Sequence, residues 1–199
     1  MAEQRTRGTG LAGRAVTAVV MALLALVATP GAAGAADGPG TRSDSARFAP
    51  QAAGEGLSAS QTRTLQNRVD EYLAKTSGTQ VAANEIALAG GGTLLLALPG
   101  EARARDLAAR GENLTAACPY TYVCAYSGEN FTGDELRLYT CNYPVRIYWT
   151  GTGSWINNQR STLYAKFYDS NYNIGWTSPG GYSEDRHAPW GWVWWLSPC

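Results

Sequence analysis

Residues 118–133 constrain the fold of this chain more than any other part of its sequence. Five residues separate Cys118 from Cys124, so a disulfide between them can close only where the backbone reverses direction. Pro119 favours such a turn because its ring fixes φ. An alternating pattern follows, in which Cys124 and Tyr126 share one face. The stretch therefore predicts a β-strand that begins at a small disulfide ring.

A β-hairpin is expected directly after this strand. Tyr126 and Phe131 are five positions apart with a glycine between them, so the two rings can pack on each other across a turn. Gly133 can adopt the positive φ that such a turn requires. In the returning strand, the alternation places Leu136 inward and Arg137 outward.

All four cysteines lie in the second half of the chain: Cys118, Cys124, Cys141 and Cys199. Four cysteines allow three pairings. The short ring favours Cys118 with Cys124, which leaves Cys141 with Cys199. Loop-closure entropy assigns these two bridges roughly 2.4 and roughly 4 kcal/mol of stabilisation. A small domain needs such cross-links because its core is small.

The amino terminus has the pattern of a secretory signal peptide over residues 1–35. Arginines precede an apolar run over residues 15–28, and small residues follow at 33–36. The run is shorter than the roughly 20 residues that span a bilayer, so no stable membrane anchor is expected after cleavage. We therefore expect a secreted, extracellular protein, in which disulfides can form.

Charge and histidine content argue against two classes of function. Without residues 1–35 the net charge is about −2, and the chain has no basic stripe, so no nucleic acid partner is expected. His187 is the only histidine. An enzyme would need it to work with Asp185 or Glu184, because triads and two-histidine zinc sites require more than this chain offers. We expect the protein not to be an enzyme.

Two segments have the amino-acid composition of linkers. Residues 36–57 are rich in small and polar side chains and predict a disordered tether. Residues 101–115 are charged and rich in alanine, and predict a short helical linker with Arg103, Arg105 and Arg110 exposed.

A small helix-plus-hairpin segment is expected between them, over residues 58–100. Ser58 and Gln61 have the spacing of a capping box, and apolar residues then recur at helical intervals, which predicts a helix over residues 59–75. Residues 80–98 predict a hairpin that turns on a glycine triplet. Two roles remain open for this segment: a packing spacer, or a pro-segment that accompanies the last domain during export.

The interval of Tyr126, Phe131 and Gly133 resembles the Greek-key motif of βγ-crystallin domains. Together with the preceding Cys-Pro-x4-Cys, it resembles the streptomycete metalloproteinase-inhibitor family, which are secreted peptidase inhibitors with a βγ-crystallin-type domain. The resemblance covers residues 116–199. It implies a mainly β, disulfide-stapled Greek-key sandwich. It also implies a monomer whose partner is an extracellular thermolysin-like protease.

A second, imperfect copy of the motif occurs at Phe167, Tyr172 and Gly175. Its aromatics keep the interval of the first copy, but its glycine arrives one residue late. We therefore expect a bulge or a longer turn in this half.

The reactive residues of that family cannot be assigned here by position. Its type member presents the reactive bond inside a second small disulfide ring, whereas Cys141 has no partner a few residues away. The nearest substitute follows Cys141, is stiffened by a proline and offers two aliphatic side chains to the hydrophobic pocket of a protease. This predicted inhibitory loop comprises Pro144, Val145, Arg146 and Ile147.

A second candidate site resembles the calcium-binding stretch of microbial βγ-crystallins: Asn157, Asn158, Ser161 and Thr162. These side chains supply the oxygen ligands that Ca²⁺ prefers. The stretch occurs once and contains no carboxylate, so we expect at most weak Ca²⁺ binding and no required cofactor. Alternatively, the same residues cap the loop through local hydrogen bonds.

Tryptophans alternate in a predicted final strand, with Trp190, Trp192 and Trp194 on one face and Trp195 on the other. They could form the core or a platform for sugars, and the large apolar area of tryptophan favours the core. The alternative to an inhibitor is thus a non-inhibitory binding module, for calcium, a glycan or a cell surface, as in killer-toxin-like crystallins.

Overall fold

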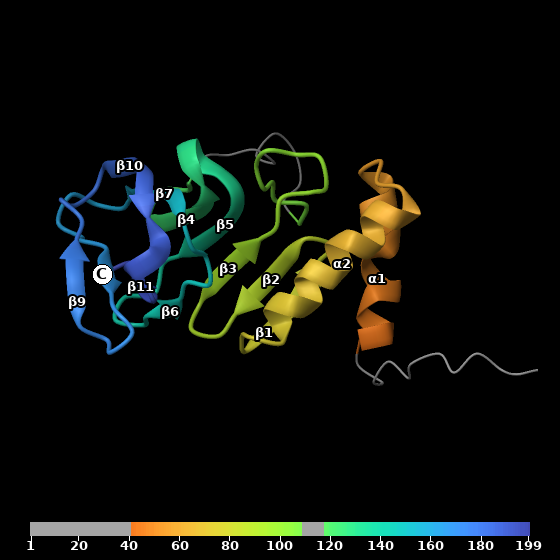
Figure 1. Cartoon of the computed structure of the whole chain (residues 1–199), viewed down its shortest axis with the longest axis horizontal. Coiled ribbons are helices and arrows are strands. Elements are labelled where there is room, and N and C mark those ends of the chain that lie inside the picture. Colours follow the sequence, from red (N-terminus) through yellow and green to blue (C-terminus); the bar gives the residue numbers. More distant parts are fainter. Residues whose placement is uncertain (1–40, 109–117) are drawn as a thin grey trace, which may run out of the picture. The chain divides into compact units, whose positions relative to one another are not determined.

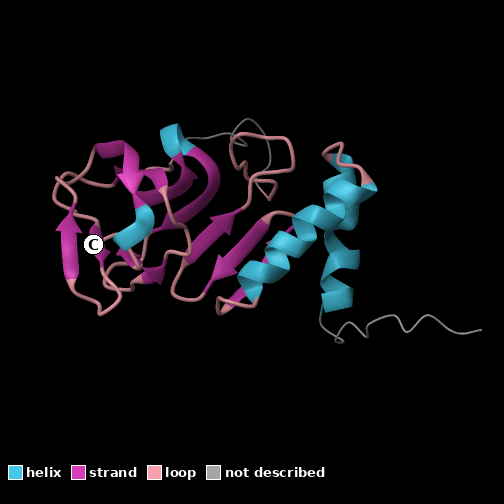
Figure 2. Cartoon of the chain, in the orientation of Figure 1, coloured by secondary structure: helices cyan, strands magenta, loops and turns pink. Residues whose placement is uncertain are grey.

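A computed structural model describes residues 41–108 and 118–199, with side chains from residue 46 onward. Within these ranges the protein is mainly β, with two short α-helices and two sheets (Figures 1 and 2). The helices are α1 (Thr41–Gly54) and α2 (Ala59–Leu73). The strands are β1 (Gly78–Ala82), β2 (Glu85–Leu88), β3 (Gly92–Leu95), β4 (Tyr122–Gly128), β5 (Thr132–Leu138), β6 (Val145–Arg146), β7 (Thr152–Asn158), β8 (Lys166–Tyr168), β9 (Ile174–Thr177), β10 (Ser183–Pro189) and β11 (Trp195–Ser197), and two 3-10 turns are η2 (Glu129–Phe131) and η3 (Trp190–Trp192).

The expected signal peptide lies outside the described residues. Among the helices that the structure does describe, none has the length and apolar character needed to cross a membrane.

Helix α2 begins where the sequence predicts. The Ser58 hydroxyl accepts a hydrogen bond from the backbone N–H of Gln61 at 3.3 Å, and the Gln61 side chain accepts one from the N–H of Ser58 at 3.0 Å. This is the capping box expected from the spacing of the two residues. Leu65 and Val69 are buried, and Figure 1 shows α2 alongside β1 and β2. The helix predicted over residues 59–75 is present, and it ends at Leu73.

The expectation of a disordered tether over residues 36–57 is wrong for the part that forms α1. Phe48 and Ala52 are buried in the core. The Gln51 side chain donates to the Leu107 carbonyl at 3.1 Å and accepts from the Ala83 N–H at 2.6 Å. Contacts with residues far along the chain therefore hold α1, and local composition does not reveal such contacts.

The expected helical linker is also corrected over its described part. Residues 101–108 are not helical, and Leu107 is buried. Arg103 is exposed as predicted, but Arg105 pairs with Glu101 at 3.0 Å and with Glu55 at 2.7 Å. The segment thus packs back toward α1. The rest of the linker, including Arg110, lies outside the described residues.

Seven antiparallel strands form one sheet in the order β1-β2-β3-β5-β4-β7-β10. The segment over residues 58–100, which the sequence analysis set apart, supplies three of these strands. The β2–β3 turn falls on the predicted glycines, but a further turn separates β1 from β2, where Asn84 donates to the carbonyls of Leu96 and Arg105. The link to the rest of the sheet is β3 against β5, with Leu94 opposite Leu136. The described residues, 41–108 and 118–199, accordingly belong to one compact unit.

The second sheet has four strands in the order β6-β11-β8-β9. Aromatic side chains fill the core between the two sheets. Trp155 packs against Phe167 with ring centroids 5.5 Å apart, and Trp190 stacks on Phe167 at 6.2 Å. The Trp190 indole N–H donates to the Tyr126 carbonyl at 2.8 Å, and a Cβ at Gly153 would collide with this indole. Trp190 is therefore a core residue.

The two motif copies differ in structure. In the first, Tyr126 and Phe131 pack edge to face at 5.5 Å, and Gly133 has φ of 82°. In the second, Phe167 is buried, whereas Tyr172 is exposed and stacks on Trp195 at 4.5 Å. The β8–β9 register shifts between Phe167 and Tyr168, so the expected irregularity is confirmed. Gly175 lies against the ring of Trp192.

Both expected disulfides are confirmed. Cys118 is bonded to Cys124 and Cys141 to Cys199. The first bridge is buried beside β4, with Cys124 fully enclosed. Next to the second bridge, the Asn142 N–H donates to the Cys199 carbonyl at 2.9 Å. This bridge therefore fixes the segment before β6 to the segment after β11.

Arg137 does not point outward as the alternation predicts. Its side chain is 9% exposed, its Nε lies 2.9 Å from Glu135 Oε1 and its Nη1 lies 3.2 Å from Asp106 Oδ2. Glu135 is buried as well. The segment before residue 109 covers this face of β5, so a charged pair occupies positions that an uncovered sheet would leave in water.

Raising the pH above about 10 is expected to destabilise the fold through Tyr126. Burial, and then the Glu135 carboxylate, raise the pKa of this phenol above its ordinary value. An unfolded tyrosine ionises while the folded one keeps its proton, so the free energy of unfolding falls by up to about 1.4 kcal/mol per pH unit. Urea denaturation between about pH 9 and pH 11 measures this slope. Tyr126→Phe should reduce it, and an unchanged slope would contradict the assignment.

Candidate functional site

The predicted inhibitory loop is partly a strand. Val145 and Arg146 form β6, which lies at the edge of the four-stranded sheet and pairs with β11. Ile147 is only 3% exposed, and its N–H donates to the Trp194 carbonyl at 2.8 Å. The expectation that Ile147 enters a protease pocket is corrected, because its side chain belongs to the core. Pro144 and Val145 are half-buried.

Arg146 lies at the centre of a cluster of aromatic side chains. Its guanidinium carbon lies 3.7 Å from the ring centroid of Trp194, 5.4 Å from that of Trp195 and 5.6 Å from that of Tyr148. Tyr172 extends the cluster by stacking on Trp195. We call this set the aromatic–arginine patch: Arg146, Tyr148, Tyr172, Trp194 and Trp195.

Much of the patch is accessible to a partner. Trp194 is 42% exposed, Tyr172 54% and Tyr148 36%. The Arg146 guanidinium also donates to the Trp194 carbonyl at 3.1 Å, so its position over the rings is fixed by a hydrogen bond as well as by cation–π attraction. The patch thus holds large side chains in place before any partner arrives.

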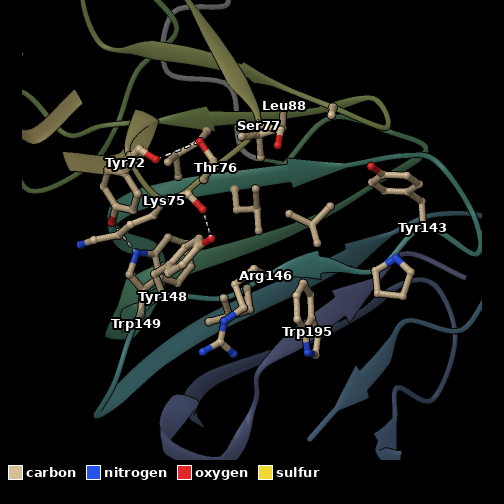
Figure 3. Close-up of a pocket in the computed structure, with 16 residues that line it drawn as sticks. Tyr72, Lys75, Thr76, Ser77, Leu88, Tyr143, Arg146, Tyr148, Trp149 and Trp195 are labelled. Carbon is tan, nitrogen blue, oxygen red and sulfur yellow. Dashed lines mark hydrogen bonds between the residues drawn. The ribbon is translucent and has the colours of Figure 1, made fainter. Parts of the chain in front are cut away.

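A cavity of about 260 Å³ lies beside the patch, between two parts of the chain that are far apart in sequence. Figure 3 shows Tyr143, Arg146 and Trp149 on one side and residues of the α2–β1 connection, such as Lys75 and Ser77, on the other. Most of its walls are apolar. The helix-plus-hairpin segment therefore forms half of this candidate site.

Hydrogen bonds join these two sides. The Trp149 indole N–H donates to the Tyr72 hydroxyl at 2.8 Å, and that hydroxyl donates to Asp134 at 3.2 Å (Figure 3 shows the first of these). Arg68 from α2 pairs with the same carboxylate at 2.5 Å. The Tyr148 hydroxyl donates to the Lys75 carbonyl. These contacts hold the segment that follows β6 against α2 and so limit its freedom.

The candidate calcium stretch is engaged in protein contacts. The Asn157 side chain is fully buried; it donates to the Leu163 carbonyl at 3.0 Å and accepts from the Gln159 side chain at 3.0 Å. Asn158 donates to the Cys118 carbonyl at 2.8 Å. Ser161 and Thr162 are exposed. These hydrogen bonds are those expected of the loop-capping alternative.

His187 offers no catalytic arrangement. Its side chain is 64% exposed, and its ring nitrogen Nδ1 lies 3.5 Å from a carboxylate oxygen of Glu129. The expected partner for catalysis was Asp185 or Glu184. Within the described ranges, no group of three or more His, Cys, Asp or Glu side chains could hold a metal ion.

The tryptophans of the predicted final strand fall into two sets. Trp190 is buried, and Trp192 and Trp194 are exposed at 38% and 42%. The 3-10 turn η3 replaces the alternation expected up to Trp194, and β11 begins at Trp195. Sequence reasoning missed Tyr148 and Tyr172 as surface residues. The density of aromatics around β6 was a signal, but it did not distinguish surface from core.

Comparison with known proteins gives one match. Residues 112–178, roughly a third of the chain, match the model of peptidase inhibitor family I36, the streptomycete metalloproteinase inhibitor family. This confirms the resemblance drawn from the motifs and supports the role of a non-enzymatic peptidase inhibitor with a protease as partner. Neither the curated proteins nor the solved structures contain a match.

Proposed function

We propose, from the match of residues 112–178 to peptidase inhibitor family I36, that the chain is a secreted inhibitor of extracellular proteases, with thermolysin-like metalloproteases as the targets. That match is the observation on which the proposal rests. The region from β4 onward would serve as a βγ-crystallin-type scaffold for the inhibitory surface. Two disulfides are in keeping with an extracellular location.

The aromatic–arginine patch has the composition of a protease-binding surface. Tryptophan, tyrosine and arginine are the residues that contribute most to binding energy in protein interfaces, and here they adjoin one another on the surface. Their contacts with each other fix them before binding. Little conformational entropy would then be lost when a protease docks.

Strand β6 supplies a second feature that suits a protease. Proteases bind extended peptide backbone, and β6 is an extended segment at the edge of its sheet. Its ends are tied by the bridge from Cys141 to Cys199 and by the buried side chain of Ile147. These restraints would take the place of the second small disulfide ring of the type member. A backbone that is held on both sides of β6 would keep its conformation when a protease binds it.

The test is a titration of thermolysin with the full exported chain, followed with a small chromogenic peptide. Arg146→Ala and Trp194→Ala should each raise the inhibition constant by about 30-fold or more, the effect of losing roughly 2 kcal/mol at a hot spot. Tyr120→Ala is the matched control, since Tyr120 is 63% exposed and lies outside the patch. It should change inhibition by no more than about twofold.

Two results would change the proposal. If the folded chain inhibited a serine protease such as subtilisin but not thermolysin, the metalloprotease target would be wrong and the inhibitor role would stand. If thermolysin were inhibited equally by the parent chain and by both patch variants, the protease-binding surface would lie elsewhere.

A further inference from the structure

A second cavity, of about 380 Å³, lies apart from the patch, where edge strand β9 of one sheet meets edge strand β10 of the other. Its aromatic lining is dense. The buried rings of Trp155, Phe167 and Trp190 lie beneath Trp176 and Trp192, which are 41% and 38% exposed. The volume is in the range of small-molecule pockets, which begin at about 300 Å³.

The walls of this cavity are fixed by packing. Trp176 lies 5.1 Å from Phe167 and 5.4 Å from Trp155, measured between ring centroids. The Trp192 ring lies so close to Gly175 that a Cβ there would collide with it. The aromatic surfaces are therefore held in position without a ligand, which lowers the entropy that binding would cost.

One acidic residue lines the cavity together with these aromatic residues. Asp185 is the only charged side chain among the described residues that line the cavity. One of its oxygens accepts the backbone N–H of His187 at 2.9 Å. Among the ion pairs of the described chain none includes Asp185, because the neighbouring Arg186 pairs with Glu184 at 2.8 Å. Among the described residues, no basic side chain therefore pairs with its carboxylate.

From this arrangement we infer that the cavity between β9 and β10 binds a small organic cation that carries an alkylated ammonium group. The faces of tryptophan rings attract such cations, and the attraction grows when water is excluded. A carboxylate at the edge of the aromatic lining adds charge complementarity. A sugar could also stack on these rings, but it would leave the charge of Asp185 uncompensated. The site uses none of the patch residues and does not depend on the inhibitor role.

The test is a calorimetric titration of the full chain with choline, supported by tryptophan fluorescence. The neutral isostere 3,3-dimethylbutan-1-ol is the matched ligand, because it has the same shape without the charge. Choline should bind at least about tenfold more tightly than the alcohol. Nα-acetyl-lysine amide, titrated in parallel, distinguishes a free cation from a lysine side chain as the natural source of the group.

Two substitutions locate the binding. Asp185→Asn keeps the size of the side chain and its acceptor for the His187 N–H, and should weaken choline binding about tenfold or more. Trp192→Ala should weaken it by about 5-fold to 30-fold. Tyr120→Ala is the control, because Tyr120 is an exposed aromatic residue outside the cavity. Circular dichroism establishes that each variant is folded.

The inference is overturned if the alcohol binds as tightly as choline, if Asp185→Asn binds choline like the parent chain, or if N-acetylglucosamine binds and the cations do not. Absence of binding by every one of these ligands also overturns it. A preference for the lysine amide supports the cation site and identifies a protein side chain as its ligand.

Discussion

A chain that lacks residues 41–111 is expected to lose its cooperative fold, although it retains the whole region that matches the inhibitor family. The reason lies in the seven-stranded sheet. Strand β3 pairs with β5 along its length, and Leu94 of β3 belongs to the same core cluster as Leu136 and Leu138 of β5. Without β1–β3, β5 becomes an edge strand, and the backbone groups that pair with β3 are exposed to water.

The expected size of this effect follows from the area exposed. Each large aliphatic side chain that loses its cover costs about 1.5–3 kcal/mol. Leu136 and Leu138 are buried, and Asp134 and Arg137 would lose their partners Arg68 and Asp106. The sum is comparable with the entire stability of a domain, about 5–15 kcal/mol. Far-ultraviolet and near-ultraviolet circular dichroism during urea denaturation would measure it.

A chain that begins at residue 41 is the control for this truncation and should unfold at the same urea concentration as the full chain. If residues 112–199 alone unfolded cooperatively at that concentration, the helix-plus-hairpin segment would be an appendage. That result would restore the interpretation of residues 58–100 as a separate unit, such as a removable pro-segment. Loss of folding would instead make the segment part of the inhibitor scaffold.

Local signals in the sequence predicted local structure well. The capping box between Ser58 and Gln61 located the start of α2, and the short cysteine interval predicted both disulfide pairings. The motif around Phe131 predicted the first aromatic hairpin. Each of these signals acts within a few residues, so one sequence is enough to interpret it.

Long-range contacts could not be predicted in the same way. The pairing of β3 with β5 and the docking of α1 depend on which surfaces meet in space, and hydrophobic periodicity does not name a partner. For the same reason Arg137 was placed outward, although Asp106 approaches it from a distant segment. The candidate site was affected too: the sequence indicated Arg146, but the rings around it come from three separate segments.

Replacing Cys141 and Cys199 together by alanine is expected to reduce both stability and inhibition. The bridge closes a loop with a sequence separation of 58, so its loss should lower the free energy of unfolding by about 4 kcal/mol by loop-closure entropy. Urea denaturation without reductant measures this loss. The bridge also ties the ends of β6 and β11, which present the patch. The inhibition constant, measured where the variant is still folded, should therefore rise.

The double replacement of Cys118 and Cys124 by alanine separates these two effects. This bridge closes a ring with a sequence separation of 6, so its loss should lower the free energy of unfolding by about 2.4 kcal/mol. Removing the two buried sulfurs adds a further loss of packing. The bridge lies beside β4 rather than beside β6, so the folded variant should inhibit like the parent chain. If both double variants lost stability but neither lost inhibition, the bridge from Cys141 to Cys199 would stabilise the fold without positioning the protease-binding surface. The aromatic–arginine patch would then keep its arrangement through the pairing of β6 with β11 and the contacts of Arg146 alone.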